Sequence, residues 1–391
     1  MQRNQLISTI KTIAMDQTLY HFSLIIALPL MIFFGVNMIL ARTPEKKIYA
    51  NFLLSRRVMG TALLVLSANY SVHYFCSPRL IDVCATILMN LATYFLCYWL
   101  FSSAMMTLLN KRYITRRRVA QHLTMWLAYA AMAIVVTLWV PQGIKQQVCV
   151  VVMAVWLIIY GTFLSVRLLR TYYKAVKMFS DNHSDDIGAY IRWLSIFTIW
   201  AIVFGVSCSA LTFLPDKYVF LWVLSSIPFY IYLYCCYQNY MLSYEKVENA
   251  IEEEKSYEQA AAATGHTTAA TSGLETDTPA YHTEIARRIK EWIDSDGFCE
   301  PGLTLKDLSD HLCTNRTYLS EYINSVYHMS FRDWITSMRI DFAKRRMKEH
   351  PEQKMLEISE HTGFLSLSHF TKTFTEKEGC SPARWRKNLD K

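Results

Sequence analysis

The chain has many residues that can bind metals or act as nucleophiles, with ten cysteines and eleven histidines among 391 residues. Their spacing suits neither task. No CxxC pair occurs and no two histidines stand at ligand spacing, so the sequence predicts no metal site. The motifs HExxH, GxSxG and GxGxxG are also absent. We therefore expect no catalytic residues, no enzyme activity and no cofactor.

Two polar side chains stand inside an otherwise apolar stretch. Asn69 and His73 are four residues apart, which places them on one face of a helix. Polar groups inside a membrane cost free energy and often have a function, so these residues form a candidate site for a small lipophilic ligand. The alternative is that they join neighbouring helices through hydrogen bonds, and we favour this alternative.

This pair lies in the second of seven apolar segments. Each segment is close to the length of about twenty residues that a helix needs to cross a bilayer. The second segment is the most polar of them. The segments are residues 20–41, 58–75, 81–109, 119–140, 148–169, 190–214 and 218–242. The sequence therefore predicts a seven-helix transmembrane bundle over residues 1–242.

The charges of the connecting loops alternate along the chain. Residues 42–57, 110–118 and 167–177 carry four or five Lys or Arg each, whereas the loops between them carry one each. Positive charge collects on the cytoplasmic side of a membrane. This pattern needs all seven spans and predicts an N-terminus outside and a C-terminus in the cytoplasm.

Residues 243–280 separate the apolar part from the rest of the chain. Helical spacing continues through residues 243–259, which we interpret as a solvated stalk, with a homodimer contact as the alternative. Residues 260–280 are rich in Ala, Thr and Gly and lack apolar periodicity. This composition is typical of a flexible linker, which a protease could also cleave to release the segment that follows.

Residues 281–391 show the periodicity of several short helices. Thr304, Asn315 and Ser366 stand where helix N-caps are expected, each before an apolar stripe. One pair of short helices follows Thr304, and a second pair has Gly363 between its two helices. These pairs predict two helix-turn-helix motifs, joined by a longer helix over about 331–349. With 18 basic against 17 acidic residues in this part, bulk charge does not identify a partner.

This part of the chain resembles the AraC-type regulators over about residues 285–390. The resemblance depends on Ile358 to Phe364, on Ser366 to Phe374, on Gly379 to Pro382 with Arg386, and on an upstream motif and connecting helix. It implies a domain with two recognition helices that enter successive major-groove segments of double-stranded DNA. The whole chain is thus predicted to be all-α, a seven-helix transmembrane bundle followed by a soluble AraC-like domain.

By position, the resemblance assigns nine residues to the DNA interface. These are Arg316, Thr317, Ser320 and Glu321 in the first recognition helix, and Leu367, Ser368, His369, Thr371 and Lys372 in the second. Arg345 and Arg346, on the connecting helix, are candidates for phosphate contacts between the two motifs. Arg and Lys can reach guanine edges or phosphates, and Glu can accept from cytosine.

These inferences combine into a one-component transcription regulator in the bacterial cytoplasmic membrane. The expected partners are DNA and the lipid bilayer, with a homodimer partner, a small lipophilic ligand and a partner membrane protein as further candidates. The competing hypothesis is a seven-span receptor or transporter whose C-terminal domain is a protein-interaction module. Intact caps and cores in both motifs argue against it.

Overall fold

The computed structural model describes residues 2–78, 81–111, 113–211, 216–263 and 279–389. Within these residues the regular structure is helical, with one isolated β-bridge, which agrees with the predicted all-α class. The helices form two compact units, each described below by itself. The first comprises Met1–Tyr173 and Ile191–Glu245, and the second Lys174–Tyr190 and Lys246–Lys391.

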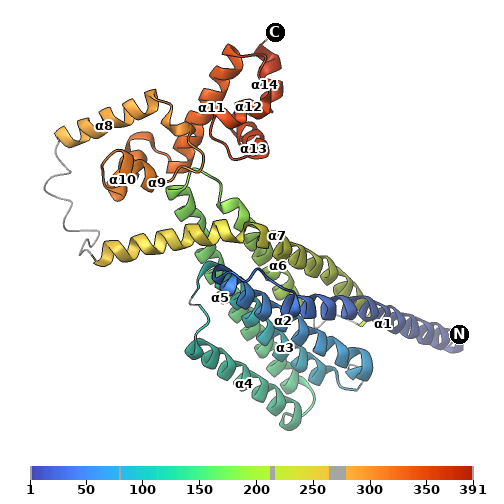
Figure 1. Cartoon of the computed structure of the whole chain (residues 1–391). Coiled ribbons are helices and arrows are strands. Elements are labelled where there is room, and N and C mark those ends of the chain that lie inside the picture. Colours follow the sequence, from blue (N-terminus) through green and yellow to red (C-terminus); the bar gives the residue numbers. More distant parts are fainter. Residues whose placement is uncertain (1, 79–80, 112, 212–215, 264–278, 390–391) are drawn as a thin grey trace. The chain divides into compact units, whose positions relative to one another are not determined.

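Seven long helices account for the apolar half of the chain (Figure 1). They are α1 (Gln2–Leu40), α2 (Ala50–Cys76), α3 (Val83–Leu109), α4 (Arg116–Trp139), α5 (Ile144–Asn182), α6 (Gly188–Leu211) and α7 (Asp216–Ala263). Each of the seven predicted segments lies on one of these helices apart from one or two residues at its ends, and residues 212–214 of the sixth lie outside the described residues. The linker predicted at 260–280 lies mostly outside them, since residues 264–278 are not described.

Five of the described helices are long and apolar enough to cross a membrane, namely α1, α3, α4, α5 and α7. The other two differ from them for separate reasons. α2 has the length, but Asn69, Ser71 and His73 make it more polar than the others. α6 is apolar, but its stretch Gly188–Val203, the part whose side chains the structure describes, is shorter than a full span. The predicted number of seven spans thus stays a prediction.

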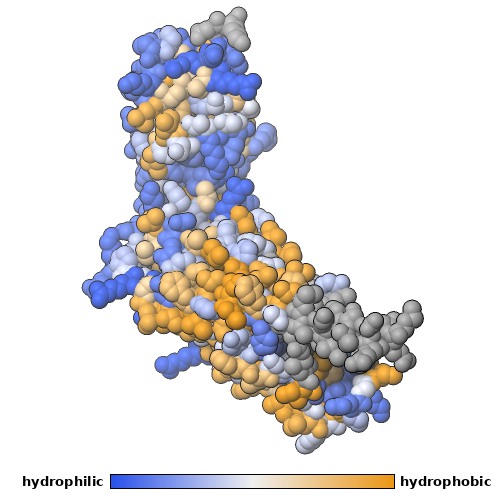
Figure 2. Space-filling model, turned by 90° about the vertical axis from the view of Figure 1, so that its right-hand side faces the viewer, coloured by the Kyte–Doolittle hydropathy of each residue, from blue (hydrophilic) through white to orange (hydrophobic). Residues whose placement is uncertain are grey.

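Apolar side chains face outward over much of the first unit. Leu127, Ile134 and Ile159 are between 54 and 59% exposed. Figure 2 shows the result as a surface coloured mainly as hydrophobic over these helices, whereas hydrophilic colours dominate on the helix-turn-helix part. A continuous apolar surface of this kind is unstable in water and requires a lipid or protein partner.

Asn69 and His73 are buried between α2 and α3. Asn69 Nδ2 donates to Thr93 Oγ1 at 2.9 Å, and His73 Nε2 lies 2.8 Å from Asn90 Oδ1. Both contacts join the two helices. Hydrogen bonds between helices were the interpretation that we favoured for these two residues. The contacts do not support the other interpretation, a ligand site, which stays a prediction.

The second unit contains the short helices of the C-terminal part. They are α8 (Pro279–Asp294), the 3-10 turn η3 (Gly297–Cys299), α9 (Leu305–His311), α10 (Arg316–Tyr327), α11 (Phe331–Glu349), α12 (Met355–His361), α13 (Leu367–Glu378) and α14 (Pro382–Leu389). Two apolar cores hold them together. One gathers side chains of α8 to α11, and the other gathers side chains of α11 to α14.

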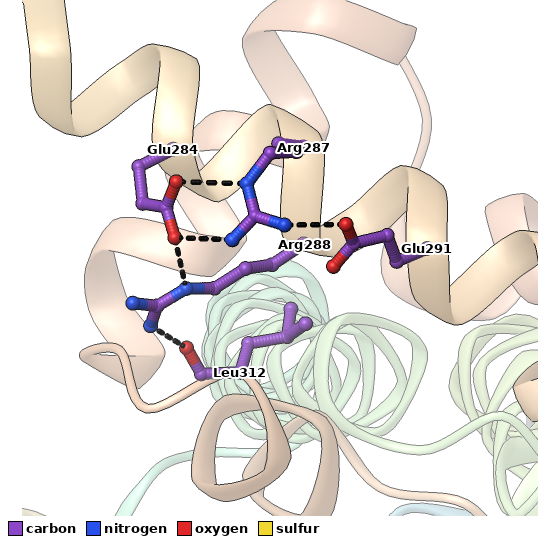
Figure 3. Close-up of polar contacts among 5 residues, drawn as sticks. All are labelled: Glu284, Arg287, Arg288, Glu291 and Leu312. Atoms are coloured by element: carbon purple, nitrogen blue, oxygen red, sulfur yellow. Dashed lines mark hydrogen bonds and ion pairs between the residues drawn. The ribbon is translucent and has the colours of Figure 1, made fainter.

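α8 is tied to the first helix pair by a polar network (Figure 3). Glu284 accepts hydrogen bonds from both Arg287 and Arg288, and Arg287 also pairs with Glu291. Arg288 Nη1 in turn donates to the carbonyl oxygen of Leu312 at 2.9 Å. Because Leu312 is the C-cap of α9, this bond satisfies a carbonyl that the helix leaves without an internal partner.

Candidate nucleic-acid interface

The first helix pair, α9 and α10, has its predicted caps in place. Thr304 forms a capping box with Asp307 at the start of α9, and Asn315 Oδ1 accepts from the backbone N–H of Thr317 at 2.7 Å at the start of α10. Leu308 and Leu319 are fully buried in the first core. The capped ends and the shared core fix α10 against α9 as in a helix-turn-helix motif.

The second pair, α12 and α13, repeats this plan. The Ser366 hydroxyl accepts from the backbone N–H of His369 at 3.2 Å, which caps α13 as predicted. Phe370 and Phe374 are fully buried, and Trp385 packs against the same core. Gly363 lies in the turn between the helices with a φ of +77°, a conformation that favours glycine.

Arg339 of α11 connects the two motifs from the inside. Its side chain is 1% exposed, and it donates to the carbonyl oxygens of Phe298 at 2.8 Å and Glu300 at 2.6 Å. The guanidinium also lies 5.8 Å from the ring centroid of Phe364, which belongs to the second core. Arg339 therefore contacts both halves of the domain, and the recognition helices α10 and α13 belong to one compact unit.

The predicted residues of α10 divide by exposure. Thr317 and Glu321 are exposed, and Ser320 is half-buried. Arg316 is different because its guanidinium forms an ion pair with Glu254 of α7, and its side chain is only 11% exposed. Glu254 lies in the same compact unit. No local pattern in the sequence indicates this contact.

The predicted residues of α13 lie along one helix, and four of them are at least partly accessible. Ser368 and Lys372 are exposed, and His369 and Thr371 are half-buried. Leu367 packs partly against the second core, so it offers less to a ligand than its neighbours do.

Two acidic residues, Asp185 and Asp186, modify the electrostatics of α13. Asp186 Oδ2 lies 4.0 Å from Lys372 Nζ. Burial lowers the pKa of His369, while Asp185 and Asp186 act in the opposite direction. The imidazole is therefore neutral at physiological pH and can both donate and accept hydrogen bonds.

Arg345 and Arg346 lie on α11, at different degrees of exposure. Arg345 is 63% exposed and lies 4.0 Å from Asp296, a distance at which an exposed pair contributes little. Arg346 is half-buried and donates to Gln353 Oε1 at 3.3 Å. The exposed Arg345 is thus the freer of the two to meet a phosphate.

Comparison with known proteins agrees with this geometry. Residues 308–388 match a family model described as a helix-turn-helix domain. This range runs from α9 to α14 and so includes both recognition helices. The C-terminal part of the chain is therefore a helix-turn-helix domain.

Its curated relatives are bacterial regulators. The chain is 33% identical over 86 residues to the HTH-type transcriptional regulator ExsA of Pseudomonas aeruginosa. The aligned residues are 22% of this chain and 31% of that protein. The chain is 30% identical over 88 residues to the melibiose operon regulatory protein of Escherichia coli, covering 22% and 29%. It is 26% identical over 112 residues to the Msm operon regulatory protein of Streptococcus mutans, covering 29% and 38%.

The chain thus spans about a third of the length of these relatives. The family match at residues 308–388 lies in the C-terminal part of the chain and says nothing about the apolar helices. No solved structure matches the chain.

Proposed function

We propose that this chain is a membrane-anchored, sequence-specific DNA-binding transcription regulator. The observation that carries the proposal is the presence of two helix-turn-helix motifs, α9–α10 and α12–α13, in one compact unit and joined by α11. Two recognition helices held in this way can enter successive major-groove segments on one face of a duplex. The nine residues assigned to α10 and α13 are the proposed DNA contacts, with Arg345 and Arg346 as proposed phosphate contacts.

The membrane part of the proposal includes all seven helices. Residues 183–184 pair through their backbones with residues 303–304, so both segments lie on the same side of any membrane. The chain between them must then cross an even number of times. Since α7 is long and apolar enough to cross, this condition requires α6 to cross as well, and the positive charge of residues 110–118 likewise favours a crossing by α2.

The bundle serves as an anchor and as the proposed sensor in the bacterial cytoplasmic membrane, with the N-terminus outside. The predicted outside loops are short, so the cue would be a small lipophilic molecule, a change in the bilayer or a partner membrane protein. No cofactor is needed for any of these steps.

Chromatin crosslinking and sequencing with tagged full-length protein tests the proposal. An Arg316→Ala/Lys372→Ala variant removes two positive charges from the recognition helices. A Lys290→Ala/Lys348→Ala variant removes the same charge from exposed positions outside them and serves as the control. We expect discrete peaks with the wild type and the control, and their loss in the recognition-helix variant.

Two other results would redirect the assignment. Equal profiles for all three proteins, each intact in the membrane, would favour a receptor or transporter with a protein-interaction module. An immunoblot that reveals a soluble C-terminal fragment under inducing conditions would show that proteolysis in the linker at 260–280 releases the DNA-binding domain.

A further inference from the structure

The segment between α5 and α6 is attached to the helix-turn-helix domain. Lys174–Tyr190 belongs to the same compact unit as that domain. The backbone N–H of Ser184 donates to the carbonyl oxygen of Leu303 at 3.0 Å, and His183 and Thr304 form an antiparallel bridge. Because Leu303 and Thr304 lead directly into α9, the segment is fixed beside the first helix-turn-helix motif.

The cytoplasmic end of α7 reaches the first recognition helix. Glu254 forms an ion pair with Arg316, the first residue of α10, and the two side chains are 17% and 11% exposed. Asn182 Nδ2 donates to the same carboxylate at 3.3 Å. An ion pair with so little exposure is poorly screened by solvent and salt. Because its side chain is only 11% exposed in this pair, Arg316 offers little to a DNA phosphate or a guanine edge while the pair is formed.

The second recognition helix meets a looser contact. Asp186 lies 4.0 Å from Lys372 of α13 and 2.9 Å from Arg332 of α11. Lys372 is 47% exposed, and a cavity of about 480 Å³ lies beside it, lined by His369 and Lys246 among others. An acid side chain therefore lies beside a cation on each recognition helix. The pair at α10 is nearly buried, whereas Lys372 lies 3.9 Å from Glu376 of its own helix as well, so Asp186 adds only a weak attraction at α13.

Glu254 and Asp186 are anions beside the two cations that are proposed to contact DNA. Each recognition helix bears one long cation among its proposed DNA contacts, and each of these cations faces an acid of the same compact unit. A carboxylate and a phosphate are both anions that bind a guanidinium or an ammonium group. A carboxylate that holds the donors of a cation leaves fewer of them for a phosphate, and its negative charge also repels the phosphate.

We propose that Asp185, Asp186 and Glu254 form an acidic clasp that competes with DNA for Arg316 and Lys372, so that the structure is the autoinhibited, DNA-free form of the regulator. Asp185 takes part by facing the buried Arg339 at 3.9 Å, which seats the segment against α11. The clasp rests on the proposed DNA-binding function. The membrane helices can control the clasp directly, because Asp185 and Asp186 lie in the segment between α5 and α6 and Glu254 lies on α7.

Binding to sheared genomic DNA by the full-length protein in detergent micelles tests the clasp. A Glu254→Ala/Asp186→Ala variant opens it. An Asp294→Ala/Glu349→Ala variant removes the same two negative charges at exposed positions and controls for the general attraction between a more basic protein and DNA. Bound fragments are counted by sequencing over a protein titration.

We expect the clasp variant to occupy its preferred fragments at about a tenfold lower protein concentration than the control, a coupling of ordinary size. DNA should also accelerate hydrogen exchange of the Ser184 amide, because its bond to Leu303 opens. Equal occupancy by the clasp variant and the control, with unchanged exchange at Ser184, would overturn the clasp and leave the proposed function intact. No preferred fragments for any protein, the clasp variant included, would overturn the proposed function and the clasp with it.

Discussion

Gly363 stands in the turn of the second helix-turn-helix motif, where a side chain meets two obstacles. Its φ is +77°, and a Cβ built there would lie 2.3 Å from the carbonyl oxygen of Cys299. Gly302 has nearly the same φ of +75°, but a Cβ there would meet nothing within 4 Å. An alanine at Gly302 would therefore cause backbone strain alone, whereas an alanine at Gly363 would cause backbone strain and a steric overlap.

We expect Gly302→Ala to cost about 1 kcal/mol of stability, since only the left-handed conformation is penalised. Gly363→Ala should cost more, about 3 kcal/mol, because the η3 turn must also move away. Thermal unfolding of the full-length variants in detergent, followed by a dye or by limited proteolysis, measures the difference. Equal losses at the two glycines would show that the contact with Cys299 does not constrain the domain.

His183 makes the docking of segment Lys174–Tyr190 onto residues 303–304 depend on pH. Burial lowers its pKa from 6.5 to about 4, with Arg316 acting in the same direction and Asp307 in the opposite one. Between these two values the undocked state binds more protons than the docked one, so docking weakens as the pH falls from about 6.5 towards about 4. The whole effect is at most about 3 kcal/mol.

Hydrogen exchange of the Ser184 amide, corrected for its intrinsic dependence on pH, measures this change. We expect protection to fall across that range in the wild type and to stay nearly constant in a His183→Gln variant, which cannot titrate. A wild-type profile as flat as that of the variant would contradict the role of His183.

At the scale of elements, the sequence specified the helix-turn-helix part well. The caps at Thr304, Asn315 and Ser366 and the connecting helix at 331–349 were predicted and are confirmed. Each of these features depends on residues within a few positions of one another, which local patterns record. The predicted stalk over residues 243–259 is part of α7, which continues to Ala263. Val247 and Ile251, two apolar residues of the stalk that a homodimer contact would use, are buried within the chain.

The pairing of α2 with α3 is the element whose polar residues can be tested. If His73 serves packing, a His73→Leu/Asn90→Leu double variant should lose about as much stability as either single variant, with a coupling of about 1 kcal/mol. Target-gene expression should stay unchanged in Asn69→Leu and His73→Leu. Thermal unfolding and a transcriptional reporter measure the two effects. Altered expression without a loss of stability would instead favour the ligand site.

At the scale of the whole molecule, the sequence failed to predict how the domain is held. Glu254 and Arg316 are 62 positions apart, and Asp186 and Lys372 are farther apart still. A charge pair at such separations leaves no periodic trace in the sequence, and each acid resembles an ordinary solvated side chain. Only the fold brings together the segment after α5, the end of α7 and the two recognition helices.

The proposed membrane topology depends on the same long-range contacts and can be measured directly. Seven spans place Lys111 and Asp186 in the cytoplasm and Gly143 outside. If only the five most apolar helices crossed, with the same outside N-terminus, all three positions would exchange sides, and the segment around Asp186 could not contact α9 or α13. Single cysteines introduced as Lys111→Cys, Gly143→Cys and Asp186→Cys, in a chain without its native cysteines, distinguish these arrangements. On intact cells, a membrane-impermeant maleimide should label only the Gly143→Cys protein, whereas labelling of the other two would contradict both the seven-span bundle and the acidic clasp.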